Sequence, residues 1–416
     1  MFFFVMVFVV RNGSIFQGAP QRYAFFATSS LFFLPKIEKL NIMNLTFIFF
    51  LICFVIQLYF IVFYFGKLSI QLQKTQRPTL HSKQDAPIGV SIVIAAKNEA
   101  QNLPALLENL AEQDYPLFEI LIVDDFSTDQ TKEILESYQK KIPFLRYLPL
   151  QTLADSGGKK RALNAGILES RYDLLLLTDA DCLPKSKRWI QFFVEKMEDS
   201  KVQIVLGVSP YRVAPTLLNW VVQWETLLTA LQYLSFALKG KPYMGVGRNL
   251  AYRKSLFLSK GGFSKHWHFK SGDDDLFVQG AAEAQNTAIL TESDSHTFSD
   301  APTTWWAWFL QKKRHLAAGN YYRTNIRLHL AFFLLSLIGF YVTLSWIYLG
   351  TKWGIEAGAL YLFRYVIFSL VLHLITRKLA YSLAVLTLPF FELFFVLYYP
   401  FTALTAFFSP HTTWKK

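Results

Sequence analysis

Apolar residues form two patterns along the chain, with long runs near both ends and short runs between them. Residues 45–65 are nearly all apolar, and a helix rising about 1.5 Å per residue over this length crosses a hydrocarbon core roughly 30 Å thick. We therefore predict a first membrane span at residues 43–66. Three C-terminal runs predict further spans, at residues 328–349, 357–375 and 381–408. Because Pro389 and Pro400 interrupt the last run, it predicts a span, a kinked span or a re-entrant hairpin.

The middle of the chain, residues 88–300, alternates short apolar runs with stretches of helical period. This pattern predicts an α/β domain with a Rossmann-like, mostly parallel sheet covered by helices. Strands are expected at residues 90–95 and 119–123, and helices at residues 103–113 and 131–140. Polar residues interrupt the apolar segment 216–238, which predicts a buried or interfacial helix rather than a span. The flanking segments are predicted as a linker at 67–87, an amphipathic interface helix at 301–327 and about three transmembrane helices at 328–410.

The first 42 residues do not fit either pattern. The apolar run 1–10 lacks the basic start of a signal peptide and is too short to span a membrane. Met43 directly precedes the first predicted span. We expect residues 1–42 to be a gene-start artefact, with translation beginning at Met43, or an N-terminal extension.

Composition narrows the class of protein. The chain has 416 residues, of which 52% are hydrophobic, so part of it is expected in lipid. A net charge of +12 suggests anionic partners, but no basic stretch alternates with aromatic residues as in nucleic-acid platforms, which excludes a nucleic-acid partner. Membrane lipids and phosphorylated substrates are expected instead. The two cysteines, Cys53 and Cys182, do not suggest a disulfide.

Positive charge brackets the central domain. Four basic residues follow the first span, and five precede the second: Lys67, Lys74, Arg77, Lys83, Lys312, Lys313, Arg314, Arg323 and Arg327. Loops rich in Lys and Arg stay on the cytoplasmic side of a membrane. We therefore expect an integral protein of the plasma or inner membrane, with its central domain in the cytosol.

Acidic residues follow two predicted strands. Asp124 and Asp125 come directly after the strand at 119–123, and ligands of open α/β sheets bind outside the carboxyl ends of the strands. Contacts to a nucleotide are one interpretation; a polar turn with a helix cap explains the same residues equally well. Asp179 and Asp181 follow four consecutive leucines, and such hard oxygen ligands suit Mg²⁺ or Mn²⁺. An acidic turn is again the alternative.

A glycine-containing loop leads into a basic segment between these two acidic pairs. Residues 156–166 read Ser-Gly-Gly-Lys-Lys-Arg-Ala-Leu-Asn-Ala-Gly, with Lys159 at the expected start of a helix. Such a loop lets backbone amides and a lysine approach phosphate groups. A solvated basic helix face is an equally good interpretation.

Together, these motifs resemble the family 2 glycosyltransferases of GT-A fold, in particular the membrane branch that contains cellulose and hyaluronan synthases. The resemblance covers about residues 88–320 and rests on the strand 90–99, the Val123–Asp129 segment, the Lys159 loop and the DxD motif Asp179-Ala-Asp181. It implies that Asp179 and Asp181 hold a divalent metal, Mg²⁺ or Mn²⁺. It also implies nucleotide contacts from Glu99, Asp124, Asp125, Lys159 and Asp179.

The resemblance extends to the catalytic and acceptor groups. Gly272-Asp273-Asp274-Asp275-Leu276 stands where the family carries its catalytic acid motif, usually Glu-Asp, one residue, then Asp and Leu. Alignment on Leu276 makes Asp273 the base, whereas alignment on the acidic pair makes Asp274 the base. We favour Asp273. The acceptor side is expected at Gly247, Asn249, Gln311 and Arg314.

The function that the resemblance implies is an inverting transfer of a sugar from a nucleotide-sugar, by family default a UDP-sugar, to a glycan or lipid-linked acceptor. His315 stands where processive synthases carry a tryptophan, which weakens an assignment as a polymer synthase. A processive polysaccharide synthase that also translocates its product remains one alternative. A catalytically silent membrane scaffold is the other, and it does not explain acidic residues at so many strand ends.

Overall fold

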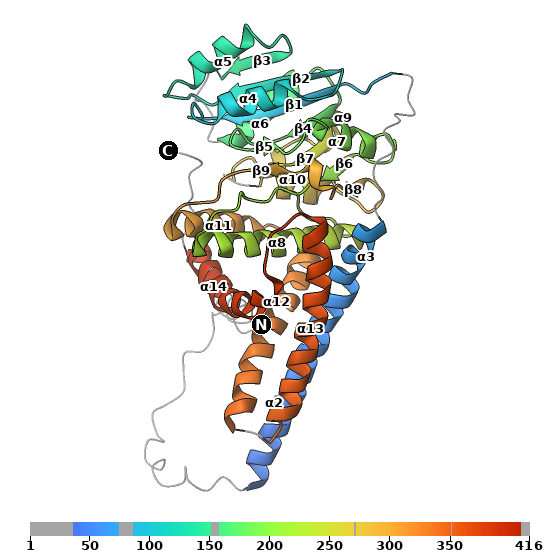
Figure 1. The fold of residues 1–416 in the computed structure, drawn as a ribbon, viewed down its shortest axis with the longest axis vertical. Coiled ribbons are helices and arrows are strands. Elements are labelled where there is room, and N and C mark those ends of the chain that lie inside the picture. Colours follow the sequence, from blue (N-terminus) through green and yellow to red (C-terminus); the bar gives the residue numbers. More distant parts are fainter. Residues whose placement is uncertain (1–35, 75–85, 151–157, 270–271, 351, 409–416) are drawn as a thin grey trace, which may run out of the picture. The chain divides into compact units, whose positions relative to one another are not determined.

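The computed structural model describes residues 36–74, 86–150, 158–269, 272–350 and 352–408 (Figure 1). The chain divides into two compact units. One unit comprises Met1–Phe60 and Leu328–Ile367, and the other comprises Ile61–Arg327 and Phe368–Lys416. The predicted artefact or extension at residues 1–42 lies largely outside the described residues.

The larger unit contains a seven-stranded sheet of order β3-β2-β1-β4-β7-β6-β8. All neighbouring strands are parallel except at β7, which is antiparallel to both β4 and β6. A separate two-stranded sheet pairs β5 with β9. The strands are β1 Val90–Ala96, β2 Phe118–Asp124, β3 Leu145–Pro149, β4 Leu174–Leu177, β5 Leu183–Pro184, β6 Ile204–Leu206, β7 Leu250–Arg253, β8 Thr287–Ile289 and β9 Thr297–Phe298.

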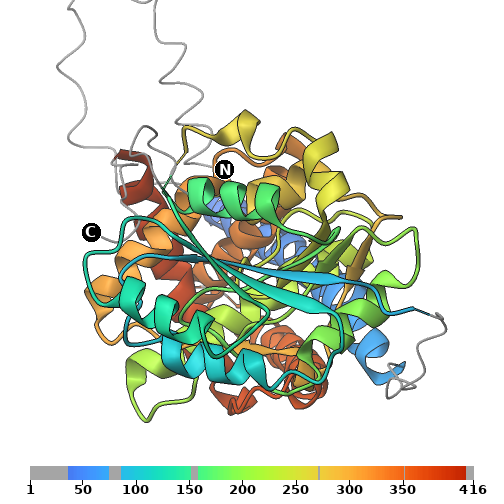
Figure 2. The ribbon, with the colours of Figure 1, turned by 90° about the horizontal axis from the view of Figure 1, so that it is seen from above.

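Helices pack on both faces of this sheet, as Figure 2 shows from above. Their ranges are α4 Leu103–Ala111, α5 Thr131–Gln139, α6 Lys159–Glu169, α7 Trp189–Met197, α9 Lys254–Ser259 and α10 Asp275–Ala281. Short 3-10 turns lie at Ser264–His266 and Ser293–Ser295. The alternation of strands with helices is the architecture predicted from the sequence, and the first two strands and helices begin and end within two residues of their predicted limits.

The sheet forms a core that is apolar on both faces. Every residue of β1 and β4 is buried, because helices cover the sheet on each side. Side chains of α4 and α7 pack into the same cluster as those of β1 and β2. On α6, Gly166 lies so close to the sheet that an added Cβ would come within 2.7 Å of Val93 and 2.8 Å of Val123. The glycine thus lets α6 approach the two strands closely.

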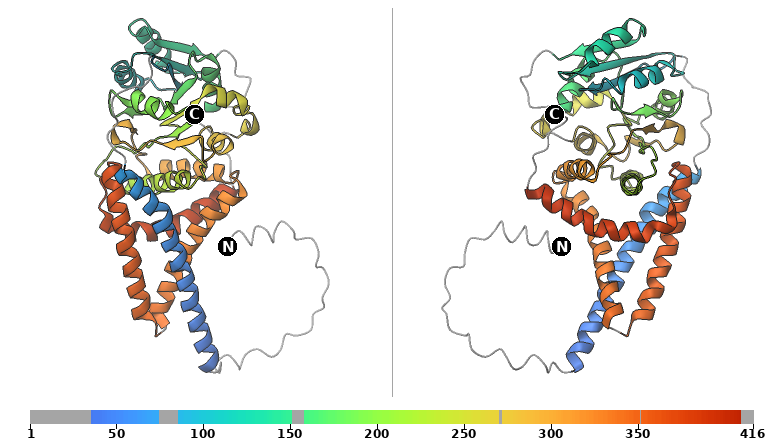
Figure 3. Two further views of the ribbon diagram at one scale, coloured as in Figure 1. Left: turned by 90° about the vertical axis from the view of Figure 1, so that its right-hand side faces the viewer. Right: turned by 60° about the vertical axis from the view of Figure 1, so that its left-hand side comes forward.

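Three long helices of the same unit form a layer beyond the sheet (Figure 3). They are α8 Leu217–Leu238, α11 Trp305–Gly319 and α14 Leu388–Phe408. Thr216 and Thr304 begin the first two, since each threonine hydroxyl accepts a hydrogen bond from the backbone amide three residues ahead. α8 is the helix predicted at 216–238 as buried or interfacial, and most of its side chains are buried.

The smaller unit is built from helix α2 Lys36–Tyr59, helix α12 Thr324–Gly350 from Leu328 onward and the first part of α13 Gly354–Lys378. Phe50 of α2 stacks on Phe340 of α12 with ring centroids 5.0 Å apart. A polar chain also joins the helices: Arg364 donates to Gln57, and Gln57 donates to the hydroxyl of Ser336 at 2.7 Å. Buried polar groups in apolar helices require such partners.

Four helical segments of the described residues are long and apolar enough to cross a membrane: Met43–Lys74, Thr324–Gly350, Gly354–Lys378 and Val385–Thr405. They coincide with the four predicted runs. The first segment continues as a π-helix at Phe60–Phe65 and helix α3 Gly66–Lys74, into the predicted linker. In the last segment, Pro389 falls in the first turn of α14, where a missing amide is tolerated, and Pro400 lies inside the helix.

Candidate active site

The carboxyl ends of parallel strands bring the first acidic pair to one edge of the sheet. Asp124 is the last residue of β2 and pairs in register with Ala96 of β1. One oxygen of Asp124 accepts hydrogen bonds from the amide and the hydroxyl of Ser127, at 3.0 and 2.5 Å. These contacts form a polar turn, which was the second interpretation of this acidic pair in the sequence. Asp124 therefore fixes the loop after β2.

Asp125 is almost fully buried and pairs with cations. Arg161 of α6 forms a hydrogen-bonded ion pair with it, and Lys97, just after β1, lies 3.9 Å away. Glu99 is buried nearby: its backbone amide donates to the hydroxyl of Thr131, and its carboxylate accepts from Asn102. The structure therefore gathers Glu99, Asp124 and Asp125 at the edge where the sequence expected nucleotide contacts.

The second acidic pair follows β4. Asp179 and Asp181 group with Cys182 so that one ligand atom of each lies within 4.8 Å of the others. The Cys182 thiol donates to Asp181 at 3.4 Å. Burial, with the neighbouring aspartates, raises the pKa of Cys182 well above its usual value, so the thiol stays protonated and orients the carboxylate.

Lys159 joins the two acidic motifs that the sequence placed far apart. Its ammonium lies 2.7 Å from Asp179 and 3.1 Å from Asp273. Burial alone would lower the pKa of Lys159, but the surrounding carboxylates raise it well above its usual value. Gly158 precedes it with φ of +52°, a conformation that glycine adopts without strain, and begins α6. The first two residues of the predicted loop, 156 and 157, lie outside the described residues.

The three consecutive aspartates differ in what holds them. Asp274 caps α10: its carboxylate accepts the amides of Asp275 and of Gly247, each at 2.8 Å. Asp275 accepts the amide of Leu276 and the hydroxyl of Tyr322. Asp273, in contrast, makes its ion pair with the side chain of Lys159.

The pKa values of the three aspartates also shift in different directions. Burial would raise the pKa of Asp273, but the charge and hydrogen bond of Lys159 hold it below its usual value. Burial and the neighbouring Asp273 raise the pKa of Asp274. Burial and the neighbouring Asp274 raise that of Asp275 to about 7, against the opposing hydrogen bond from Tyr322. Asp273 is thus the member of this trio whose pKa is lowered rather than raised.

The residues expected on the acceptor side fall into two groups. Gly247 lies at the site, since its amide binds Asp274 and an added Cβ would come within 3.3 Å of that carboxylate. Asn249 is fully buried, and its amide group binds Trp189 and the carbonyls of Val208 and Ser295. These contacts assign Asn249 to positioning the strand.

Gln311 and Arg314 both lie on α11. The side-chain amide of Gln311 donates to the Tyr211 hydroxyl at 3.0 Å. The Tyr211 ring lies under the guanidinium of Arg248, 4.3 Å from the ring centroid. A chain of contacts therefore runs from α11 to Arg248. Burial would lower the pKa of Arg248, but Tyr211, Cys182 and the two aspartates after β4 raise it.

Sequence reasoning missed Arg248, Lys160 and Tyr322. Arg248 stands between Gly247 and Asn249, two residues expected on the acceptor side, and a basic residue at this position was a usable signal. Lys160 is buried and donates to the carbonyls of His266 and Phe269, both at 2.8 Å, in the segment before Asp273. Burial lowers the pKa of Lys160 to about 8. No pattern in the sequence pairs Tyr322 with Asp275.

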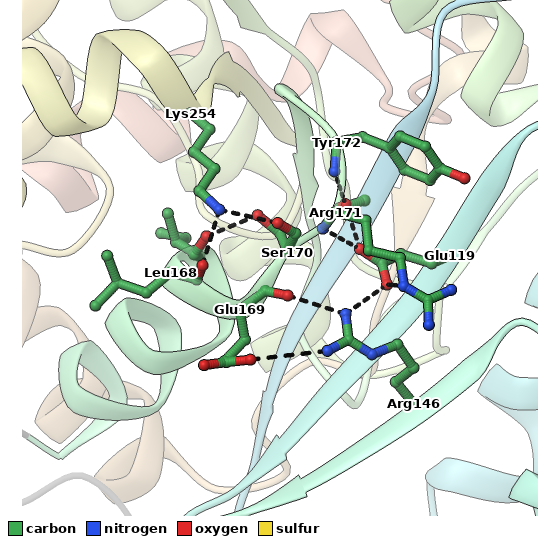
Figure 4. A network of polar contacts seen from close by, with 10 residues as sticks. Glu119, Arg146, Leu168, Glu169, Ser170, Arg171, Tyr172 and Lys254 are labelled. Carbon is green, nitrogen blue, oxygen red and sulfur yellow. Dashed lines mark hydrogen bonds and ion pairs between the residues drawn. The ribbon is translucent and has the colours of Figure 1, made fainter.

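The far end of α6 is fixed by a polar network at the opposite end of the strands (Figure 4). Lys254 donates to the carbonyls of Leu168 and Ser170, and Arg146 donates to the carbonyl of Glu169. Cations at a helix C-terminus satisfy carbonyls without an intrahelical partner. With its C-terminus held, α6 presents Lys159, Lys160 and Arg161 to three different partners, because successive helical residues point about 100° apart.

A mostly parallel sheet with one reversed strand is the arrangement of the GT-A fold, and here the lysine that joins two acidic motifs lies at its strand ends. Residues 91–259 match the family model Glycosyl transferase family 2. The matched residues lie in the central domain, where the motifs predicted a resemblance to this family.

Relatives among curated proteins are also glycosyltransferases. The Probable glycosyltransferase YdaM of Bacillus subtilis (strain 168) is 29% identical over 241 residues, which cover 56% of this chain and 55% of that protein. The Poly-beta-1,6-N-acetyl-D-glucosamine synthase of Staphylococcus aureus (strain COL) is 23% identical over 261 residues, 61% of each chain. This chain thus spans little more than half the length of these relatives.

A solved structure shares the fold. The mannosyltransferase PcManGT from Pyrobaculum calidifontis, in complex with GDP-Man and Mn²⁺, aligns with a TM-score of 0.53 and 17% identity. The alignment covers 85% of this chain and 99% of that one. The predicted GT-A fold is confirmed at this level.

Proposed function

We propose that this protein is an inverting glycosyltransferase that moves a sugar from a nucleotide-sugar to a glycan or lipid-linked acceptor. The observation that carries the proposal is the position of Lys159 between Asp179 and Asp273, because it brings the DxD motif and the catalytic acid motif to one site. A transferase needs both at the anomeric carbon: a group that stabilises the leaving diphosphate and a base for the acceptor.

A divalent ion fits the donor set at the end of β4. The carboxylates of Asp179 and Asp181 are the hard ligands that Mg²⁺ or Mn²⁺ prefers, and they lie close enough together that they would hold one ion between them. The Cys182 thiol donates to Asp181, and sulfur is a softer ligand than Mg²⁺ or Mn²⁺ prefers. The ion, when bound, neutralises charge that develops on the departing nucleotide diphosphate. The relative PcManGT, in complex with Mn²⁺, supports this assignment.

Asp273 is the proposed base. It accepts the proton of the acceptor hydroxyl while that oxygen bonds to the anomeric carbon and the bond to the diphosphate oxygen breaks. A base must be ionised and must have an oxygen free of structural duties. Asp273 meets the first condition through Lys159, whereas Asp274 uses its carboxylate to cap α10 and hold Gly247.

The pocket for the nucleotide is proposed at Glu99, Asp124, Asp125 and Lys159. Asp125 carries paired cations, so its carboxylate is already oriented for a base or ribose group. Lys159 is placed to transfer its contacts from the two carboxylates to the diphosphate as the donor binds. The relative named as a poly-N-acetylglucosamine synthase makes a UDP-linked N-acetylhexosamine the first donor to test.

The proposed location is the plasma or inner membrane, with the catalytic domain on the cytosolic side. Four apolar helical segments support a membrane anchor, and the basic residues flanking the catalytic domain support its cytosolic orientation. Gln311 and Arg314 on α11 are proposed to line the acceptor side, where the catalytic domain meets the lipid.

The decisive experiment uses membranes that contain the full chain and a panel of nucleotide-sugars with Mn²⁺. Release of nucleotide diphosphate from one donor, absent from membranes carrying Asp273→Asn, is the expected result. If no donor is turned over and the purified chain binds no nucleotide with Mn²⁺, the transferase assignment is wrong.

A processive synthase is the second candidate, because a relative is named as a synthase of poly-N-acetylglucosamine. His315, in place of the tryptophan of processive enzymes, favours single transfer. Product length distinguishes the two: single transfer yields acceptors extended by one sugar, whereas a processive enzyme yields long chains before the acceptor is consumed.

A further inference from the structure

Two consecutive lysines begin α6 and bind different groups. Lys159 pairs with the carboxylate of Asp273 at 3.1 Å. Lys160 is only 1% exposed, and its ammonium donates to the backbone carbonyls of His266 and Phe269, both at 2.8 Å. Within the part of the chain that the structure describes, these carbonyls are its hydrogen-bond partners, and no carboxylate forms an ion pair with it.

The charge of Lys160 is costly to bury. Burial lowers the pKa of Lys160 to about 8, against the opposing charges of Asp273, Asp274 and Asp275. An apolar side chain of the same length would fill this space without that cost, but it would leave two buried carbonyls without a donor. The hydrogen bonds to these carbonyls are therefore what the ammonium contributes.

The two carbonyls belong to the segment between α9 and α10, which leads to Asp273. His266 ends a 3-10 turn, and its carbonyl also accepts the amide of Phe269 at 3.1 Å. Phe269 precedes Asp273 by four residues, and its ring packs against Tyr321 with the centroids 3.6 Å apart. Lys160 thus fixes this segment from the side of α6.

Asp273 lies between two fixed points of the backbone. Before it, the carbonyl of Phe269 is held by Lys160. After it, Asp274 caps α10 by accepting the amide of Asp275 at 2.8 Å. The backbone on both sides of the proposed base is therefore anchored, and Lys160 provides the anchor that comes from the helix facing the donor.

We propose that Lys160 is a positioning residue that keeps Asp273 in place when the donor draws Lys159 away. As the diphosphate takes over the contacts of Lys159, the ion pair that holds Asp273 in the free protein is lost. Lys160 is buried and bound to backbone carbonyls, so the diphosphate does not compete for it. Because both lysines begin α6, one helix then positions the donor and the base. This inference rests on the proposed transfer reaction.

The first test compares binding with turnover in the full chain. Lys160→Met keeps the length of the side chain and removes its donors. Affinity for UDP with Mg²⁺ should be unchanged, because Lys159 and the proposed metal ligands are kept. Transfer should fall by about 10²-fold, the loss that a misplacement of about 1 Å can cause. Lys160→Gln, whose shorter side chain keeps N–H donors, should show a smaller loss of turnover with the same affinity.

The second test follows the segment itself with a nitroxide label at His268→Cys. His268 is exposed and lies between the two carbonyl-bearing residues, whereas Cys53 and Cys182 are buried. With Lys160 present, UDP and Mg²⁺ should leave the label as immobile as in the free protein. In Lys160→Met, addition of UDP and Mg²⁺ should make the label more mobile, because neither lysine then holds the segment.

Lys254→Met is the matched control. Lys254 also donates to two backbone carbonyls, those of Leu168 and Ser170, at 2.8 and 2.9 Å, but at the other end of α6. Its loss should lower the melting temperature without making the label at His268→Cys more mobile when UDP binds. Thermal unfolding of both methionine variants shows whether their stabilities are comparable.

Each other outcome overturns the proposal. Normal transfer by Lys160→Met, or a label that stays immobile in this variant with UDP bound, removes the positioning role alone. Equal mobility in Lys254→Met assigns the effect to general loss of stability. Failure of both Lys160 variants to fold makes Lys160 a residue of the core only. If the unaltered chain binds no UDP and turns over no donor, the transferase proposal fails and the role of Lys160 fails with it.

Discussion

The ammonium of Lys159 lies 3.1 Å from the carboxylate of Asp273. Since the same ammonium is also 2.7 Å from Asp179, one side chain holds the proposed base and a proposed metal ligand together before any donor is bound. A donor diphosphate would compete for that lysine. Its binding would therefore release Asp273 from the ion pair at the moment when a base is needed.

Asp273→Asn should abolish transfer while leaving donor affinity nearly unchanged. An amide cannot accept the acceptor proton, and loss of a general base typically lowers turnover by about 10²- to 10⁴-fold. Turnover and nucleotide binding measured on the same detergent-solubilised protein separate the two effects.

Asp274→Asn is the matched control for that assignment. It weakens the cap of α10 and the contact to Gly247, so it should lower stability by about 1 kcal/mol, with a smaller loss of turnover. The opposite ranking, with Asp274→Asn inactive and Asp273→Asn active, would move the base to Asp274.

Asp181→Ala should remove metal-dependent donor binding. Asp181 contributes one of the two carboxylates at the end of β4, and a single remaining carboxylate holds a divalent ion weakly. Titration of nucleotide with and without Mn²⁺ measures the effect, and Asp199→Ala, an exposed acid on the surface, is the control. Unchanged Mn²⁺ dependence in Asp181→Ala would remove the metal assignment.

The strands of the sheet were predicted well because the signal for a strand lies within its own residues. The four leucines of β4 and the apolar run of β1 are buried on both faces, and such runs are typical of parallel strands. The sequence also placed Asp124 and Asp179 at strand ends correctly, because a strand's limits are visible in its own residues.

Contacts between distant segments were not predictable in the same way. Nothing in the residues around Lys159 indicates that its neighbour Lys160 turns toward the carbonyls of His266 and Phe269. The choice of Asp273 or Asp274 as the base likewise depends on a distant residue. The amide of Gly247 donates to Asp274, and the sequence does not indicate this contact. For α14, hydropathy detected its length but not that α8 and α11 cover one face.

Arg146→Ala should destabilise the catalytic domain more than Arg171→Ala. Glu119 is buried, and its carboxylate accepts from Arg146 at 2.8 Å and from Ser91 at 2.6 Å. Loss of one partner of a buried pair typically costs about 3–5 kcal/mol, whereas the Arg171 side chain is 62% exposed and lies 3.7 Å away. Thermal unfolding of both variants gives the comparison, and equal losses would contradict it.

The pair formed by Arg146 and Glu119 also makes the stability of the folded protein depend on pH. Burial would raise the pKa of Glu119, but the hydrogen bonds from Arg146 and Ser91 lower it overall. Because the folded pKa lies below the unfolded one, this stabilisation is present above about pH 4.5 and is lost as the pH falls through the folded pKa. Arg146→Ala should therefore flatten the loss of stability on acidification.

Asp275 should have the opposite effect near neutral pH, where it should make the folded protein less stable as the pH rises. Burial and the neighbouring Asp274 raise its pKa from 3.8 to about 7, so the folded protein binds a proton that the unfolded chain has lost. Between about pH 4 and pH 7 this group makes the folded state less stable as the pH rises. Asp275→Asn removes the penalty, and the melting temperature of this variant should exceed that of the unaltered protein increasingly toward pH 7.

Thermal unfolding from pH 5 to pH 7.5 measures that difference, and about 2–4 °C is expected for each kcal/mol in a domain of this size. Tyr322→Phe provides a second variant, because it removes the hydrogen bond that lowers the pKa of Asp275 and should extend the window above pH 7. Asp199→Asn, at an exposed acid, should leave the profile unchanged. Parallel profiles for Asp275→Asn and the unaltered protein would show that Asp275 is already ionised throughout this range.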